Sequence, residues 1–111
     1  MQAITSIRLL LRTGSARRIL LICPKPLVAN WLREFATWSP EITVAAISGS
    51  QSARDWQWKH DRAMVKIANY ELMIRDEETV TNLEQPFELV VLDEAQRVKN
   101  KSNSTLSLIH I

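Results

Sequence analysis

Two adjacent carboxylates, Asp93 and Glu94, come directly after a mainly apolar run at residues 87–92. Such a run is typical of a strand that is buried on both faces of a parallel sheet. The two acids then lie at the carboxyl edge of the sheet, where open α/β folds bind ligands. One carboxylate there can hold Mg²⁺ against nucleotide phosphates, and the other can orient an attacking water. The alternative is a buried strand that ends in a solvated acidic turn.

The residues that begin at the acid pair carry a more specific pattern, because residues 93–96 read Asp-Glu-Ala-Gln and residues 97–100 read Arg-Val-Lys-Asn. This segment resembles the second motif of the superfamily-two helicase-like ATPases and, among them, the Swi/Snf-type DNA translocases. The resemblance implies that Asp93 binds Mg²⁺, that Glu94 acts on the hydrolytic water, and that Gln96 lies by the bound ATP at the seam with a second motor lobe. Many members have His at the position of Gln96, and the Gln form also occurs in the family.

Two further turns resemble DNA-contacting motifs of the same family. Residues 23–27 read Cys-Pro-Lys-Pro-Leu, and an Asn-Trp pair follows at residues 30–31. This pattern resembles motif Ia, which implies that Lys25 and the amides at the start of the next helix contact DNA phosphates. The alternative for Lys25 is a solvated side chain in a turn bounded by prolines. The Asn69-Tyr70 pair resembles motif Ib, in which a small hydroxyl residue usually precedes Tyr, and implies a weaker DNA contact at Asn69.

The elements that position these residues follow from hydrophobic periodicity. Apolar runs that read as strands alternate with segments of helical spacing, and this alternation indicates an α/β fold with a parallel sheet flanked by helices. The strands are expected at residues 19–23, 42–47, 63–68 and 87–92, and the helices at residues 1–12, 26–38, 52–62 and from after residue 72 to about residue 78. The resemblance implies, for residues 1–105, most of the first RecA-like P-loop NTPase lobe.

Side-chain types within the helices give further expectations. Trp31 and Trp38 fall on an apolar stripe and are predicted to be core residues. Trp56 and Trp58 are two positions apart, so that one helix face cannot bury both. Ser52 is the expected N-cap of their helix. The surface of this helix is expected to be basic and solvated, with a weak phosphate-facing patch as the alternative, because it carries Arg54, Lys59, His60 and Arg62.

Composition bounds the class of protein. The chain has 111 residues, 46% of them hydrophobic, which is enough for one small domain with a core. A net charge of +2 is too small to indicate nucleic-acid binding by itself. Cys23 is the single cysteine, so we expect an inert buried thiol in a reducing compartment, the cytoplasm. The resemblance implies nucleoid association in a bacterium or a nuclear location in a eukaryote. No apolar run approaches the ~20 residues that would span a membrane. His60 and His110 have no partners at zinc-ligand spacing.

The phosphate-binding loop that such an ATPase requires is not found at either glycine, Gly14 or Gly49. Family members carry Gln-Ala-Ile shortly after that loop, and residues 2–4 match this position. We therefore expect the chain to begin just after the phosphate loop and opening strand of a longer parent, and to be inactive as an ATPase by itself. Residues 106–111, Leu-Ser-Leu-Ile-His-Ile, match a translated sequencing adaptor and are expected to be a non-native tail. The alternative is a genuine short apolar strand.

The resemblance implies that the parent couples ATP hydrolysis to movement on double-stranded DNA and remodels protein–DNA complexes. It implies ATP and Mg²⁺ as cofactors, and double-stranded DNA and the second RecA-like lobe of the same chain as partners, with no role for a membrane. Two alternatives stay open. One is a strand-separating DNA or RNA helicase of the same superfamily, and the other is a noncatalytic adaptor domain that retains only the fold.

Overall fold

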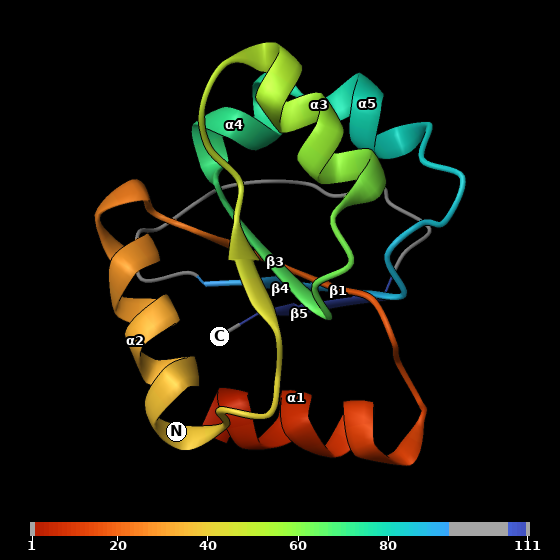
Figure 1. Ribbon diagram of the computed structural model, residues 1–111. Helices are drawn as coiled ribbons and strands as arrows, with labels where there is room; N and C mark the ends of the chain where they lie inside the picture. The colour runs from red at the N-terminus through yellow and green to blue at the C-terminus, as the bar shows by residue number, and fades with distance from the viewer. Residues whose placement is uncertain (1, 94–106, 111) are drawn as a thin grey trace.

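The computed structural model describes residues 2–93 and 107–110 (Figure 1). Within these ranges the helices and strands alternate along most of the chain. In order they are α1 (Gln2–Thr13), β1 (Ile19–Cys23), the 3₁₀ turn η1 (Lys25–Leu27), α2 (Val28–Trp38), β2 (Val44–Ala46), α3 (Gln51–His60), β3 (Val65–Asn69), α4 (Tyr70–Arg75), α5 (Glu77–Thr81), β4 (Leu89–Leu92) and β5 (Ser107–His110).

The strands form one sheet in the order β2-β3-β1-β4-β5, and every neighbouring pair is parallel. The central strand, β1, places Ile19 beside both Val65 and Leu89. Parallel neighbours align their carboxyl ends at a common edge, so the turns after β1, β3 and β4 lie together. The prediction of an α/β fold with a parallel sheet flanked by helices is confirmed, and the arrangement is consistent with a RecA-like lobe.

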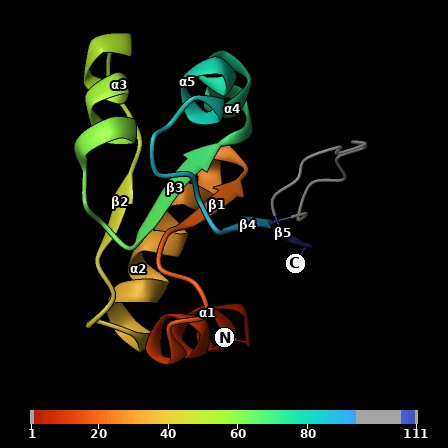
Figure 2. The ribbon, with the colours of Figure 1, turned by 90° about the vertical axis from the view of Figure 1, so that its right-hand side faces the viewer.

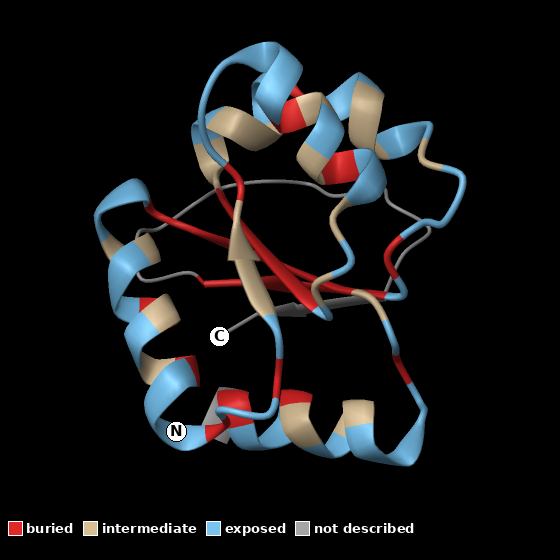
Figure 3. Ribbon diagram, in the orientation of Figure 1, coloured by how far each residue is buried: buried red, intermediate tan, exposed pale blue. Residues whose placement is uncertain are grey.

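Helices cover both faces of this sheet, as Figures 1 and 2 show from two directions, with α1 on one side and α3, α4 and α5 on the other. All five residues of β1 are buried, and the central strands are coloured as buried along their length in Figure 3. Burying an aliphatic side chain of this size contributes roughly 1.5–3 kcal/mol. Burial on two faces explains why β1 is an uninterrupted apolar run rather than an alternating one.

Two apolar clusters fill the space between the sheet and its helices. Alternate strand residues point to opposite faces, so neighbouring positions of β1 belong to different clusters. On the α1 and α2 face, Ile4, Ile7, Trp31 and Phe35 pack on Ile19, Leu21, Cys23, Val65, Ile67, Leu89 and Val91. On the other face, Trp58, Tyr70, Leu72, Met73 and Val80 pack on Leu20, Ile22, Ala68, Val90 and Leu92.

Several local expectations need correction. Ser50, not Ser52, caps α3, because its hydroxyl accepts from the amide of Ala53. The helix expected after residue 72 begins earlier, at Tyr70, and it is broken at Asp76, which ends α4 and precedes α5. Trp38 is 56% exposed rather than buried, because it is the last residue of α2 and its indole N–H donates to Glu34.

Other side-chain expectations are confirmed. Trp58 is fully buried whereas Trp56 is 58% exposed, so their helix buries one of the two. Trp31 is buried, and so is Cys23. Arg54, by contrast, was assigned to a basic helix surface, and this was wrong: it is buried in an ion pair with Asp76.

The residues expected to be a non-native tail include β5, which pairs with β4 at the edge of the sheet. This conformation is the short apolar strand of the alternative interpretation. An apolar segment can add to a free sheet edge whatever its origin, so the origin of residues 106–111 stays a prediction. None of the helices in residues 2–93 is long and apolar enough to cross a membrane.

Candidate active site

Asp93 lies directly after β4, at the carboxyl edge of the sheet. Its amide donates to the carbonyl of Ile22 at 2.8 Å, which extends the pairing of β4 with β1 by one residue. The residue as a whole is only 8% exposed, a low value for a carboxylate. Glu94 and Gln96, the other residues assigned to the ATP site, lie outside the described residues.

Two aromatic side chains hold Asp93 from opposite faces of the sheet. The indole N–H of Trp31, on α2, donates to Oδ2 of Asp93 at 2.9 Å. The hydroxyl of Tyr70, at the start of α4, donates to the backbone carbonyl of Asp93. Trp31 belongs to the cluster beneath α1 and α2, and Tyr70 packs on the cluster of the other face. The acidic residue is therefore fixed at both its side chain and its backbone.

The groups around Asp93 are held in their neutral forms. Burial, and then the negative charge of Asp93, raise the pKa of Cys23 to about 12. Burial raises the pKa of Tyr70 as well, with smaller contributions from Asp93 and Cys23. At neutral pH the thiol is thus a poor nucleophile, in agreement with the expectation of an inert cysteine, and the phenol keeps the proton that it donates.

Lys25 lies two residues beyond β1, at the same edge of the sheet as Asp93. It is exposed, and it begins the turn η1, which the amide of Leu27 closes by donating to the carbonyl of Pro24 at 2.9 Å. The helix α2 follows immediately and has no side-chain cap at its start. An exposed ammonium beside the amides of a helix start is a suitable arrangement for a phosphate.

Asn69 ends β3 at this edge and lies beside Cys23 in the strand register. Its Oδ1 accepts from the amide of Leu72 at 2.8 Å, so that the side chain caps α4. The hydroxyl residue that usually precedes Tyr in motif Ib could cap a helix in the same way. The structure thus gives Asn69 a local role, and its contact with DNA stays a prediction.

The chemistry of Asp93 fits the metal that the family implies. Mg²⁺ prefers oxygen ligands and is usually held by one or two carboxylates together with substrate phosphates. Within residues 2–93 and 107–110, no group of three or more His, Cys, Asp or Glu side chains could hold a metal ion by itself. The carboxylate of Asp93 suits an ion that shares its ligands with a nucleotide.

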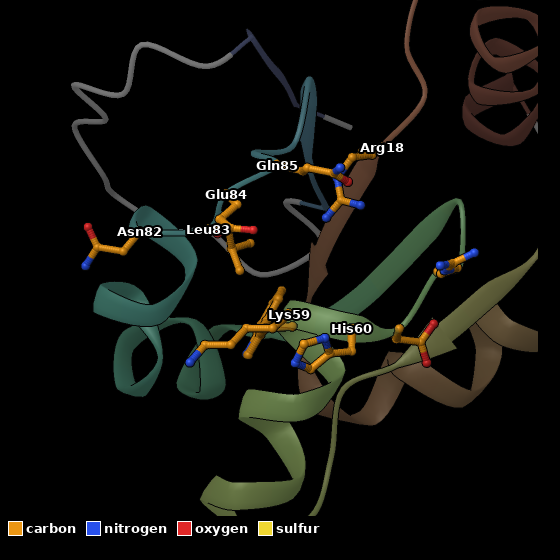
Figure 4. Close-up of a pocket in the computed structure, with 10 residues that line it drawn as sticks. Arg18, Lys59, His60, Asn82, Leu83, Glu84 and Gln85 are labelled. Atoms are coloured by element: carbon orange, nitrogen blue, oxygen red, sulfur yellow. The ribbon is translucent and has the colours of Figure 1, made fainter.

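A cavity of about 510 Å³ lies elsewhere, at the amino edge of the sheet. Figure 4 shows Lys59 and His60, from the end of α3, on one side of this cavity and residues 82–85 on the other. Arg18 and Arg62 also line it, together with the carboxylates of Asp61 and Glu84. The residues that line it come just before β1, β3 and β4 in the chain, at the amino ends of these strands, whereas Asp93 comes after β4 at the carboxyl end. The cavity is therefore separate from the acidic site and has no part in its chemistry.

Most of the chain is similar in sequence to known proteins. Residues 1–110 match the model of the SNF2-related domain. The chain is 31% identical over 96 residues to the "ISWI chromatin-remodeling complex ATPase ISW2" of Saccharomyces cerevisiae, a match that covers 83% of this chain and 8% of the relative. It is 32% identical over 101 residues to the "DNA excision repair protein ERCC-6-like" of Danio rerio, covering 86% of this chain and 7% of the relative.

A third relative, the "Protein CHROMATIN REMODELING 4" of Arabidopsis thaliana, is 29% identical over 113 residues. That match covers 87% of this chain and 5% of the relative. The chain thus spans less than a tenth of the length of these three curated relatives.

Proposed function

This chain belongs to the family of the SNF2-related domain, and we propose on that basis that it forms part of the first motor lobe of an ATP-dependent double-stranded DNA translocase. The observation that carries the proposal is the gathering of Asp93 and the Lys25 turn at one edge of a parallel sheet. Asp93, which we assign to the metal of the ATP site, and the Lys25 turn, which we assign to DNA, can be coupled mechanically because they lie on one rigid sheet edge. The complete translocase would use this coupling to turn ATP hydrolysis into movement on DNA.

Each residue of the site has a role in this proposal. Asp93 binds Mg²⁺, which when present offsets negative charge on the ATP phosphates. Glu94 orients and deprotonates the hydrolytic water, and Gln96 senses the nucleotide at the seam with the second lobe. Lys25 contacts a DNA phosphate, and Asn69 makes a weaker contact beside it. Trp31 and Tyr70 hold Asp93 in place.

The complete translocase would contain more than this chain. We propose that residues 1–105 are one part of a lobe that also includes an upstream phosphate-binding loop, that a second RecA-like lobe follows, and that this piece alone does not hydrolyse ATP. We also propose that residues 106–111 are not native. The genomic sequence on both sides tests the upstream loop, the second lobe and the origin of residues 106–111: a Gly-x-Gly-Lys-Thr stretch in frame upstream supports the enzyme, and its absence supports a noncatalytic adaptor.

The location follows from the same proposal. A motor of this kind works where duplex DNA is, in the nucleus of a eukaryote or on the nucleoid of a bacterium. The relatives are named for chromatin remodelling and DNA excision repair, and remodelling of protein–DNA complexes is the activity that we propose for the complete protein.

The decisive experiment measures ATP hydrolysis and strand separation by the complete translocase in parallel. Hydrolysis that is stimulated by duplex DNA, without separation of the strands, is the expected result. Separation of a DNA or RNA duplex would favour a strand-separating helicase. An absence of nucleotide binding and hydrolysis would favour the adaptor and overturn the proposal.

A further inference from the structure

The hydrogen bond between Trp31 and Asp93 is buried at both ends. Trp31 is 5% exposed, Asp93 is 8% exposed, and the indole nitrogen lies 2.9 Å from Oδ2. A hydrogen bond to a carboxylate is about twice as strong as one between neutral groups, and shelter from water strengthens it further. The direction of the Asp93 carboxylate is therefore tied to the position of the indole.

The indole has little freedom to move by itself. Its ring packs against Phe35, with ring centroids 6.2 Å apart, and both side chains belong to the core cluster on the α1 and α2 face of the sheet. Close-packed side chains of this kind shift together with the backbone that carries them. The position of the Trp31 indole consequently depends on the position of α2.

The same helix begins at the turn that carries Lys25. The amide of Val28, where α2 starts, donates to the carbonyl of Lys25, so the turn and the helix form one continuous unit. Trp31 lies within the first turn of α2. A displacement of the Lys25 turn is thus transmitted to the indole through a single short stretch of hydrogen-bonded backbone.

We propose that Trp31 is a positioning residue that orients the Asp93 carboxylate and couples it to the Lys25 turn. This inference rests on the function proposed above, and assigns to Trp31 the link between DNA contact and the metal-binding carboxylate. The effect of Trp31 passes through Asp93. Tyr70 complements it by donating to the backbone carbonyl of Asp93.

The test replaces Trp31 by Phe in the complete translocase, which removes the N–H and keeps an aromatic ring. We expect Mn²⁺, used as the probe for the metal in the presence of a non-hydrolysable ATP analogue, to bind roughly tenfold more weakly by electron paramagnetic resonance. We also expect the stimulation of hydrolysis by duplex DNA to fall by about the same factor. The affinity for DNA in the absence of nucleotide should be unchanged, since Lys25 is intact.

The matched control is Trp38→Phe, on the same helix. Trp38 also donates its indole N–H to a carboxylate, that of Glu34, but it is exposed and remote from Asp93. This variant should bind Mn²⁺ and respond to DNA like the wild type. If Trp31→Phe does not fold, 3-benzothienylalanine at position 31 replaces the N–H by sulfur at nearly constant ring shape, and the same two losses are expected.

The outcomes separate the two proposals. A wild-type protein whose hydrolysis does not respond to DNA overturns the proposed function, and this inference with it. A wild-type protein that responds to DNA, together with a folded variant at position 31 that keeps full Mn²⁺ affinity and full DNA stimulation, overturns the role of Trp31 alone.

Discussion

The guanidinium of Arg54 donates two hydrogen bonds to the carboxylate of Asp76, at 2.8 Å to Oδ2 and 3.0 Å to Oδ1. The indole N–H of Trp58 donates to the same Oδ2 at 2.9 Å, and a further N–H of Arg54 donates to the carbonyl of Gly49. Arg54 and Trp58 are on α3, whereas Asp76 separates α4 from α5. This buried cluster therefore joins the three helices that cover one face of the sheet.

Replacing Asp76 by Ala should lower the thermal midpoint of a protein that carries the whole lobe by several degrees. The substitution leaves the guanidinium of Arg54 buried without its carboxylate, and breaking one half of a buried pair costs more than replacing both halves. The double variant Arg54→Met/Asp76→Leu should therefore recover part of the loss. Thermal unfolding of the three proteins checks this, and a double variant less stable than Asp76→Ala would contradict it.

Lys66 should make the free energy of unfolding of the lobe depend on pH in the alkaline range. Lys66 is the second residue of β3, and its buried ammonium donates to the carbonyls of Gln57 and Trp58 at the end of α3. Burial, and then the charge of Arg18, lower the pKa of Lys66 to about 8. In the unfolded chain the pKa of a lysine is about 10.4. At a pH between the folded and unfolded pKa values, the unfolded chain therefore binds more protons than the folded one.

The free energy of unfolding should consequently rise with pH from about pH 8 to about pH 10 through Lys66, by at most about 1.4 kcal/mol per pH unit. Below pH 8 this contribution is constant. Urea unfolding of wild type and of Lys66→Met across this range isolates the effect, because other groups contribute equally to both. Parallel pH profiles for the two proteins would refute it.

Replacing Glu94 by Gln in the complete translocase should lower the rate of hydrolysis by about 100-fold or more, as expected for the loss of a general base. ATP binding should remain nearly intact, because Asp93 still holds the metal. Turnover and nucleotide affinity are measured on the same preparations. The matched control is Glu84→Gln, beyond the opposite edge of the sheet. Near-normal turnover of Glu94→Gln would disprove the assignment.

Replacing Lys25 by Ala should weaken duplex binding to a similar extent for every DNA sequence. It should also flatten the slope of log affinity against log salt by about one unit, the value for one lost phosphate contact. ATP affinity without DNA should not change. Arg12→Ala removes the same charge from the exposed end of α1 and should leave the slope unaltered. An unchanged slope for Lys25→Ala would favour the alternative, in which the Lys25 side chain is solvated and does not contact DNA.

Local patterns were sufficient to predict the strands β1 to β4 and the placement of the acidic residue, but not the pairing of β5. The apolar run at residues 19–23 matches β1 residue for residue, because a strand buried on both faces needs apolar side chains at every position. The same reasoning predicted the position of Asp93, because a polar residue directly after a buried strand such as β4 lies at the edge of the sheet. These signals lie within a few residues of one another in the sequence.

Contacts between distant residues were not predictable in this way. Trp31 was expected in the core, but its bond to Asp93 joins residues 62 positions apart. Lys66 was expected within a strand, and only the position of the end of α3 shows how its charge is accommodated. The break at Asp76 also has a tertiary cause, because the carboxylate that ends α4 is bound by Arg54 from α3. One local signal was available: an Asp inside a helix competes with the backbone for hydrogen bonds.

The place of β1 in the sheet has a consequence for the order in which the domain can assemble during synthesis. This strand leaves the ribosome before its neighbours β3 and β4, which come from much later parts of the chain. At the usual rates of translation, roughly 4 to 14 s separate the synthesis of Ile19 from that of Leu89. Throughout this interval the five consecutive apolar residues of β1 lack at least one of these two neighbouring strands. We expect β1 to be the segment of the nascent chain that a chaperone binds.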